Sequence, residues 1–341
     1  MENYMMSGEG EKNSSDVVYL CDEVFDFSTV SSAFFILIFI LSVTGNVLLL
    51  FVLAIYEDLK NITNLFILNL ACSDLVFTVT LPFWAAYYLH HWIFGDFTCK
   101  FMTAAYFVGL YSSVILLTAM TVDRFITVVL HNWWSSPVRR RRYAMAACAA
   151  AWVISIAASV SDAIKVEVET SWNNLSTCEA PSDGPDIKLG YYLQVSLLFF
   201  LPFVIIVFCY SAILKTVLQA TNRKRYRTVV VVLCIVAAFF ICWGPYNVLL
   251  FVMSMYDPRG CNEIERLYIA HSICRILAFF HCCMNPVLYL LSQKLRTHLL
   301  QLLHCKCVRI KCKERGTATT VIQNVAFIAQ NSAVTLDPHS K

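Results

Sequence analysis

The stretch Phe34–Val43, FFILIFILSV, decides the fold class. It lies within an apolar segment, Ser31–Tyr56, which is long enough to cross a bilayer, since a span needs about 20 predominantly apolar residues. A strand of an outer-membrane barrel is about 10 residues long and alternates apolar and polar side chains, whereas this stretch is continuously apolar. Because the bilayer core leaves no backbone group unpaired, the segment is expected to be a transmembrane helix.

The composition of the whole chain also indicates a membrane protein. Of the 341 residues, 58% are hydrophobic and 14% are charged, whereas a soluble chain carries about 25% charged residues. This excludes a disordered chain, a basic nucleic-acid binder and an ordinary cytosolic enzyme. Seven apolar segments recur, which predicts an all-α membrane protein, a seven-transmembrane helix bundle. The expected spans are Ser31–Tyr56, Asn64–Leu89, Phe97–Leu130, Ala144–Ile164, Leu189–Leu218, Thr228–Met255 and Leu267–Ser292.

The regions around the spans predict four parts. Residues 1–30 form an acidic extracellular N-terminal tail, and residues 31–292 form the transmembrane domain. Residues 293–303 form a short amphipathic eighth helix on the membrane surface, and residues 304–341 form a cytosolic C-terminal tail. Three cysteines follow the amphipathic stretch, which favours their palmitoylation. They are Cys305, Cys307 and Cys312.

Lys and Arg residues predict the orientation, because cytosolic loops carry an excess of them. With the N-terminus outside, 18 lie on the cytosolic side and 6 on the extracellular side. We therefore expect a multi-pass protein of the plasma membrane with an extracellular N-terminus. The extracellular segments are rich in Asp and Glu and would attract a cationic ligand; the alternative is a merely solvated surface. Asn13 and Asn174 begin extracellular Asn-x-Ser sequences and are expected to be glycosylated.

Four cysteines fall outside the membrane in this topology: Cys21, Cys99, Cys178 and Cys261. Because the outside is oxidising, two disulfides are expected, and the sequence alone leaves all three pairings open. The sequence contains no Gly-rich phosphate loop and no metal motif such as His-Glu-x-x-His. We therefore expect no catalytic site and no metal site, and the chain is not expected to be an enzyme.

Polar groups within the spans are costly, at about 2.5–3.5 kcal/mol for a mid-span charge, so they are expected to be functional. Asn46, Asp74, Ser113 and Asn285 are such groups, and Asp74 should face the bundle interior near Asn46 and Asn285. Their hard oxygen atoms could bind Na⁺; the alternative is a hydrogen-bonded packing network. No other cofactor is expected. Prolines that remove a backbone hydrogen bond also interrupt four spans. They are Pro82, Pro202, Pro245 and Pro286.

Each predicted span carries a short motif. The motifs are Gly45-Asn46, Leu70–Asp74, Asp123-Arg124-Phe125, Trp152, Pro202 with Tyr210, Cys242–Pro245 and Asn285–Tyr289. In this order, over about residues 31–303, they resemble the rhodopsin-like G-protein-coupled receptors. The family usually has Tyr where Phe125 stands, a change that removes a hydroxyl and keeps the Asp–Arg pair.

Two further stretches resemble the chemokine receptors of that family, namely Thr80–Trp84 and Phe280–Pro286. The resemblance implies disulfides Cys99–Cys178 and Cys21–Cys261. Chemokine receptors often carry Glu ten residues before the span-seven Asn, and this chain has Arg275 there. In this respect the chain most resembles the XC-type (lymphotactin) receptors.

The resemblance implies a receptor that carries an extracellular chemokine signal to an inhibitory-type heterotrimeric G protein, driving chemotaxis and calcium signalling. Its expected partners are a basic chemokine, that G protein, arrestin and membrane lipid, with no nucleic acid. The alternatives are a non-signalling chemokine scavenger and a receptor for another peptide. The expected ligand-binding residues are Tyr19, Trp84, Tyr106, Tyr246 and Arg275. Arg275 could instead pair internally, for example with an acid from an extracellular loop.

Activation is expected to swing the cytosolic end of span six outward about a hinge near Pro245, with Trp243 below the ligand pocket, and to release Arg124 from Asp123. Tyr210 and Tyr289 are then expected to hold the open form. The complete set of expected switch residues is Asp123, Arg124, Tyr210, Trp243, Pro245, Asn285, Pro286 and Tyr289. A transporter is disfavoured because the sequence shows no internal repeat.

Overall fold

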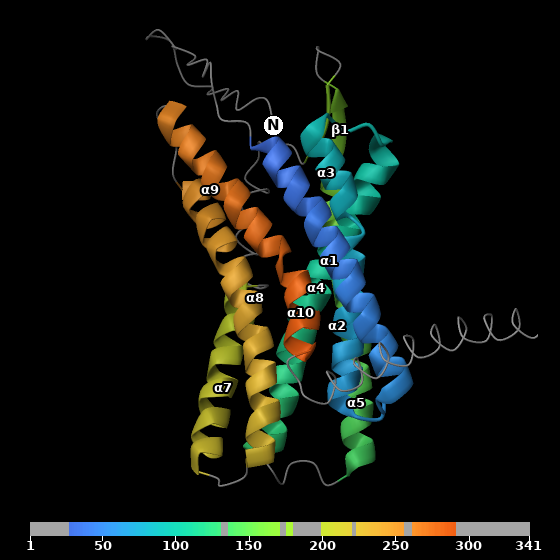
Figure 1. Cartoon of the computed structure of the whole chain (residues 1–341), viewed down its shortest axis with the longest axis vertical. Coiled ribbons are helices and arrows are strands. Elements are labelled where there is room, and N and C mark those ends of the chain that lie inside the picture. Colours follow the sequence, from blue (N-terminus) through green and yellow to red (C-terminus); the bar gives the residue numbers. More distant parts are fainter. Residues whose placement is uncertain are drawn as a thin grey trace, which may run out of the picture. The chain divides into compact units, whose positions relative to one another are not determined.

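The computed structural model describes residues 27–130, 136–170, 175–179, 199–219, 223–255 and 261–290. Most of them are helical, and two short strands and the connecting turns make up the rest (Figure 1). The helices are α1 (Ser28–Tyr56), α2 (Ile62–Thr78), α3 (Leu81–Leu89), α4 (Gly95–Val128), α5 (Pro137–Lys165), α7 (Leu201–Gln219), α8 (Arg223–Met255), α9 (Cys261–Phe279) and α10 (His281–Leu290). The strands are β1 (Glu167–Thr170) and β2 (Ser176–Glu179).

The described helices follow the seven predicted spans in order. Six segments are long and apolar enough to cross a membrane, and Leu201–Thr216 is a shorter apolar helix in the place of the fifth span. The start of that predicted span, Leu189, lies outside the described residues, as do the two tails and the predicted eighth helix at 293–303.

Prolines divide the second span and modify the seventh. A proline lacks an N–H and its ring clashes with the carbonyl of the fourth residue before it. The fourth residue before Pro82 is Thr78, and α2 ends there, with α3 beginning at Leu81. Pro286 lies inside α10, where it leaves the carbonyl of Cys282 without its usual helical donor. Pro245 lies inside the undivided α8.

Small residues allow α2 and α4 to pack closely, as is common in membrane bundles. A Cβ atom added to Gly109 of α4 would lie 2.7 Å from the backbone nitrogen of Phe77 in α2. The Ser73 hydroxyl uses this proximity to donate a 2.8 Å hydrogen bond to the Gly109 carbonyl. The backbone contact therefore fixes α2, and with it Asp74, against α4.

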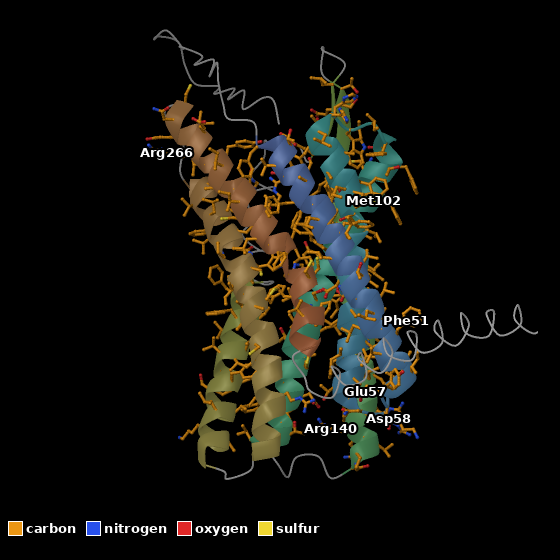
Figure 2. The ribbon with its side chains drawn as sticks, viewed as in Figure 1. Phe51, Glu57, Asp58, Met102, Arg140 and Arg266 are labelled. Atoms are coloured by element: carbon orange, nitrogen blue, oxygen red, sulfur yellow. A yellow bond between two sulfur atoms is a disulfide. The ribbon has the colours of Figure 1, made fainter. Side chains whose placement is uncertain are left out.

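A disulfide joins the β1–β2 hairpin to the beginning of α4. Cys99 of α4 and Cys178 of β2 are bonded, with 5.8 Å between their Cα atoms, as the family resemblance implies. Trp92 packs with both cysteines in a buried cluster, and its backbone N–H donates to the Ser176 carbonyl at 2.7 Å. This end of the bundle is called the hairpin end. Figure 2 shows Arg140 toward the opposite end, called the Arg140 end.

Candidate functional site

Asp74 is the centre of a buried polar cluster contributed by three helices. Its side chain is completely buried in α2. The Asn285 amide of α10 donates to its Oδ2 at 2.7 Å, and the Ser113 hydroxyl of α4 donates to its Oδ1 at 3.3 Å. The His281 Nε2 atom lies 3.8 Å from Oδ1. The structure therefore brings Asp74, Ser113 and Asn285 together, and adds His281, which the sequence analysis did not select.

Asn46 joins this cluster indirectly. Its Nδ2 donates to the Cys282 carbonyl at 3.0 Å and to the Ser42 hydroxyl at 3.1 Å. The Cys282 carbonyl is available because Pro286 provides no N–H to it. Ser42 is 2.7 Å from the Thr78 hydroxyl, which donates to the Asp74 backbone carbonyl at 2.6 Å. Asn46, which was expected to lie near Asp74, thus binds the Cys282 carbonyl that Pro286 leaves without a helical donor in α10.

The oxygen atoms of the cluster suit a small hard cation. Na⁺, like Ca²⁺ and Mg²⁺, prefers carboxylate, hydroxyl, carbonyl and water oxygens. The Asp74 carboxylate and the Ser113 hydroxyl converge from α2 and α4, and the described donors to the carboxylate are uncharged. The buried Asn46 Oδ1 has no hydrogen-bond partner among the described residues. The chemistry of these residues therefore fits the Na⁺ expected near Asp74, and Asp74 and Ser113 are the residues that would hold it.

Trp243 lies directly on the hairpin side of the cluster, within an aromatic group. It is 2% exposed, and its ring centroid is 5.4 Å from His281 and 5.8 Å from Tyr246. Its indole Nε1 is buried without a hydrogen-bond partner in the described part of the chain. The large ring is thus held by packing alone, one turn or less from Pro245 in the same helix.

The expected ligand residues in the spans form one aromatic region toward the hairpin end. The Trp84 and Tyr106 rings are 6.5 Å apart, and Tyr106 is 5.2 Å from Phe77. Phe77 in turn lies 6.4 Å from Trp243. Tyr246 lies on the other side of Trp243 and is 5.4 Å from the His271 ring. Phe77 and His271 were not predicted as members, because apolar and single polar residues are common in buried helices.

Arg275 is held by an imidazole and an aromatic ring. Its Nη2 lies 2.9 Å from the His271 Nδ1, one helical turn earlier in α9. Its guanidinium stands 5.1 Å from the centroid of the Tyr88 ring in α3, a cation–π arrangement. The suggested internal pairing with an acid is not found among the described residues, where the three ion pairs involve other groups. The described groups that contact the Arg275 guanidinium are therefore an imidazole and a tyrosine ring, and neither of them is an anion.

The expected pair of Asp123 with Arg124 is wrong for this conformation. Arg140 of α5 engages the Asp123 carboxylate through two bonds, from Nε at 2.9 Å and from Nη2 at 2.7 Å. Arg124 instead donates from Nη2 to the Thr63 hydroxyl of α2. Adjacent residues on a helix point in different directions, so Asp123 faces α5 while Arg124 faces α2. Arg140 belongs to the run of four arginines Arg139–Arg142, and the sequence analysis did not select it as a partner of Asp123.

Tyr210 is buried on α7, and Phe125, in place of the family's usual Tyr, lies 5.8 Å from Phe208 of α7. The backbone of Tyr289 is helical in α10. Cys261 is disulfide-bonded. Several expected residues lie outside the described ranges: Tyr19, Cys21, Asn13, Asn174, Cys305, Cys307, Cys312 and the side chain of Tyr289.

Known proteins similar to this chain match it over most of its helical region. A sequence profile described as "7 transmembrane receptor (rhodopsin family)" matches residues 45–289. The human Chemokine XC receptor 1 is 40% identical over 291 residues, which cover 81% of this chain and 82% of that protein. The mouse Chemokine XC receptor 1 is 39% identical, with coverages of 83% and 86%. The human C-C chemokine receptor type 8 is 32% identical, with coverages of 82% and 80%.

Proposed function

Because this chain belongs to the seven-transmembrane receptors of the rhodopsin family, and within them to the chemokine receptors, we propose that it binds a basic chemokine and signals to an inhibitory-type heterotrimeric G protein. Membership in this family makes it a multi-pass membrane receptor and not an enzyme. The proposed outputs are chemotaxis and calcium signalling. An XC-type chemokine is the first ligand to test, since two of the similar proteins are XC receptors.

One observation carries the proposal, namely a continuous path of contacts from Arg275 to Asp74. Arg275 contacts His271 at 2.9 Å, and the His271 ring lies 5.4 Å from Tyr246. Tyr246 lies 5.8 Å from Trp243, which is 5.4 Å from His281. His281 is 3.8 Å from Asp74. A ligand that displaces the side chain of Arg275 can thus shift the population of states at the polar centre, if it binds one state better.

The hairpin end is proposed to face the extracellular side of the plasma membrane. The arginine run Arg139–Arg142 lies at the other end, as expected for the cytosolic side. The basic body of the ligand would contact the acidic residues of 1–30, including the region of Tyr19, by charge complementarity. Glycosylation of Asn13 and Asn174, and palmitoylation of Cys305, Cys307 and Cys312, belong to the same proposal. Arrestin is the proposed partner of the cytosolic tail.

Arg275 is proposed to select the free end of the ligand. A guanidinium supplies a fixed fork of donors for a carboxylate or for backbone carbonyls. Tyr88 lies against the guanidinium, and the aromatic region that includes Trp84 and Tyr246 supplies apolar contact area. We propose that ligands presenting carbonyl or anionic groups at their inserted end are preferred here.

The test is a binding and signalling assay on purified receptor. A panel of chemokines is scanned for binding, and the best ligand is then tested for stimulated nucleotide exchange on an inhibitory-type G protein. Arg275→Gln is expected to lower ligand potency at least tenfold, about 1.4 kcal/mol. Arg266→Gln is the matched control, because it removes the same charge from an exposed position on the same helix. Equal potency for both variants would contradict the ligand role of Arg275.

A scavenger receptor that binds chemokine without signalling is the second candidate. Phe125 favours it, since the family's usual hydroxyl is replaced by a ring packed on Phe208. The same assay separates the two functions, because a scavenger binds the chemokine and leaves nucleotide exchange unchanged. A restored exchange in Phe125→Tyr would then identify the missing hydroxyl as the cause.

A further inference from the structure

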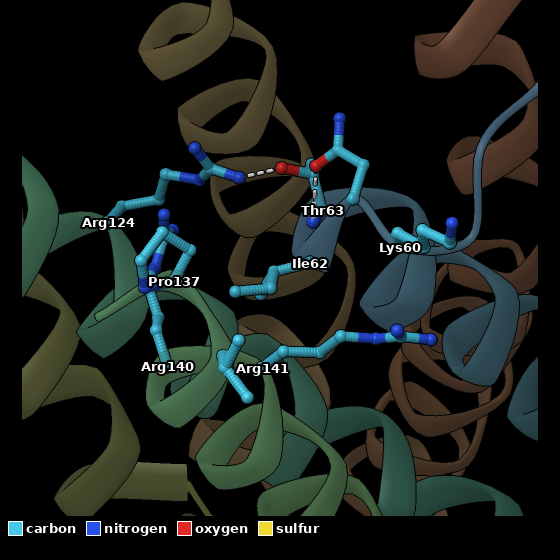
Figure 3. Close-up of a pocket in the computed structure, with 9 residues that line it drawn as sticks. Lys60, Ile62, Thr63, Arg124, Pro137, Arg140 and Arg141 are labelled. Carbon is cyan, nitrogen blue, oxygen red and sulfur yellow. Dashed lines mark hydrogen bonds between the residues drawn. The ribbon is translucent and has the colours of Figure 1, made fainter.

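A cavity of about 380 Å³ opens between the Arg140 ends of α2, α4 and α5. It is lined by Lys60 in the turn before α2, by Thr63 at the start of α2, by Arg124 of α4, and by Val138, Arg140 and Arg141 of α5. Figure 3 shows Arg124 and Arg141 extending from α4 and α5 toward the start of α2. The volume lies within the range of about 300–1,000 Å³ that small-ligand sites occupy.

The charge of the cavity is strongly positive. Four of its lining residues are cations, and none of the described lining residues is acidic. Arg140 is neutralised by its ion pair with Asp123, which does not line the cavity. The acidic residues that precede Lys60 in the chain are engaged locally. Asp58 accepts from the Lys60 backbone at 2.8 Å, and Glu57 accepts from Asn64 at 3.1 Å.

Two of the cations remain available to a ligand. Within the described residues, neither Lys60 nor Arg141 takes part in an ion pair. The Nε of Arg141 is buried, and it has no hydrogen-bond partner in the described part of the chain. A buried donor without a partner is costly, so this atom is an observation that calls for an acceptor at the cavity. An anion with several oxygen atoms satisfies it, because the guanidinium fork matches phosphate.

The position of the cavity favours a lipid over a soluble anion. Val138, which lines the cavity, is 62% exposed, and the same helix continues with exposed Tyr143 and Met145. A headgroup in the cavity would thus have apolar side chains of α5 beside it for its acyl chains. Anionic lipids are concentrated in the cytosolic leaflet, and basic pockets between transmembrane helices bind their headgroups.

We propose that this cavity binds the headgroup of an anionic phospholipid that carries phosphate monoesters on inositol. Lys60 and Arg141 are the ligands of the phosphate groups, and Val138 contacts the start of the acyl chains. The assignment rests on the proposed orientation, which places the Arg140 end in the cytosolic leaflet. It is independent of the chemokine site, since the cavity lies at the opposite end of the bundle from the hairpin.

The experiment uses the full chain in nanodiscs of phosphatidylcholine, with phosphatidylinositol bisphosphate or phosphatidylserine added at equal total charge. Bound lipid is measured by native mass spectrometry, and the melting temperature is measured in parallel. Phosphatidylinositol bisphosphate is expected to remain bound and to raise the melting temperature, and phosphatidylserine is expected to do so much less. Equal retention of both lipids by the unaltered receptor would overturn the proposal without any variant.

The double variant Lys60→Gln/Arg141→Gln is expected to weaken binding of phosphatidylinositol bisphosphate about tenfold or more, since each cation near the surface contributes to headgroup attraction. Arg139→Gln/Arg142→Gln is the matched control, because both residues are exposed and do not line the cavity. The control is expected to change the affinity less than threefold. Equal loss in both double variants would show that only the overall charge attracts lipid, and the proposal would fail.

The last part of the experiment is a competition measurement with soluble inositol trisphosphate. Inositol trisphosphate is expected to compete for the cavity more than tenfold more weakly than the lipid, because it lacks the acyl chains beside Val138. Equal affinity of the cavity for inositol trisphosphate and for the lipid would overturn the proposal of a lipid site and indicate a site for a soluble anion. Chemokine binding to the double variant is measured as well. Retained chemokine binding with lost lipid binding distinguishes a failure of this site from a failure of the proposed receptor function.

Discussion

Two carboxylates, one in the middle of the bundle and one near its Arg140 end, differ in what neutralises them. Asp74 is fully buried, and its described hydrogen-bond donors, Asn285 and Ser113, are uncharged. The Asp123 side chain is 11% exposed and is bonded by two nitrogen atoms of Arg140. A buried charge needs a partner or a change of protonation. The chain therefore supplies a counterion for Asp123, whereas the described hydrogen-bond donors to Asp74 carry no charge. We propose that a cation from solution binds at Asp74 and that the middle of the bundle is the responsive region.

The largest expected effect comes from breaking the packing that holds Asp74 in place. Gly109→Ala would place a Cβ atom 2.7 Å from the backbone of Phe77. Because backbone cannot rotate away as a side chain can, we expect a loss of about 3 kcal/mol in stability. The measurement is the melting temperature and the yield of monodisperse receptor.

Gly244→Ala is the matched control for this change. Its added Cβ atom would lie 3.7 Å from the Phe199 ring, an ordinary contact. The control is expected to keep the yield and melting temperature of the unaltered receptor. A well-folded Gly109→Ala receptor would show that α2 and α4 are not in the close contact described.

The second effect tests the fixed side of the comparison. Asp123→Asn and Arg140→Gln each remove a charge-assisted pair, which contributes about 1.5–3 kcal/mol. The double variant is expected to lose less than the sum of the two single variants, because the residues share one interaction. Arg139→Gln, at an exposed position, is expected to change the melting temperature little. Strictly additive losses would mean that Asp123 and Arg140 do not interact in solution.

The third effect tests the responsive side. Na⁺ at several times its dissociation constant is expected to stabilise the receptor by about 1 kcal/mol. Asp74→Asn is expected to remove this stabilisation, because the amide cannot balance the cation. Asp123→Asn is expected to keep it, since Arg140 already occupies that carboxylate. The measurement is the melting temperature in sodium against potassium salt. A sodium response that survives in Asp74→Asn would place the cation elsewhere.

The last effect concerns Thr63, whose hydroxyl accepts from Arg124. Thr63→Val removes this one hydrogen bond from a charged donor, a kind of bond that contributes about 1.5–3 kcal/mol. If this bond holds the present conformation, basal nucleotide exchange is expected to rise by up to about tenfold. Thr127→Val serves as control, because the Thr127 hydroxyl donates within its own helix, to the Asp123 carbonyl and more weakly to the Arg124 carbonyl. No rise in basal exchange would exclude Thr63 as a restraint on activation.

Hydropathy predicted the order of the spans because each apolar run had to be a helix in the bilayer. The polar centre was partly predictable, since Asp74 and Asn285 are too costly in a span to face lipid. Their proximity was predicted and is observed, but the partner of Asn46 was not, because it is the carbonyl of Cys282, which Pro286 exposes. The pairing of Asp123 with Arg140 depends on the rotation of α5 against α4, which local sequence does not specify. The β1–β2 hairpin was missed for a similar reason, because a disulfide and Trp92 hold it.

The most direct test of the account is nucleotide exchange by an inhibitory-type G protein, measured with and without an XC-type chemokine, in sodium and in potassium salt. The account predicts that the chemokine stimulates exchange, that basal exchange of the unaltered receptor differs between sodium and potassium, and that Asp74→Asn abolishes this difference. A chemokine that binds without changing exchange, or a sodium effect that persists in Asp74→Asn, would contradict it.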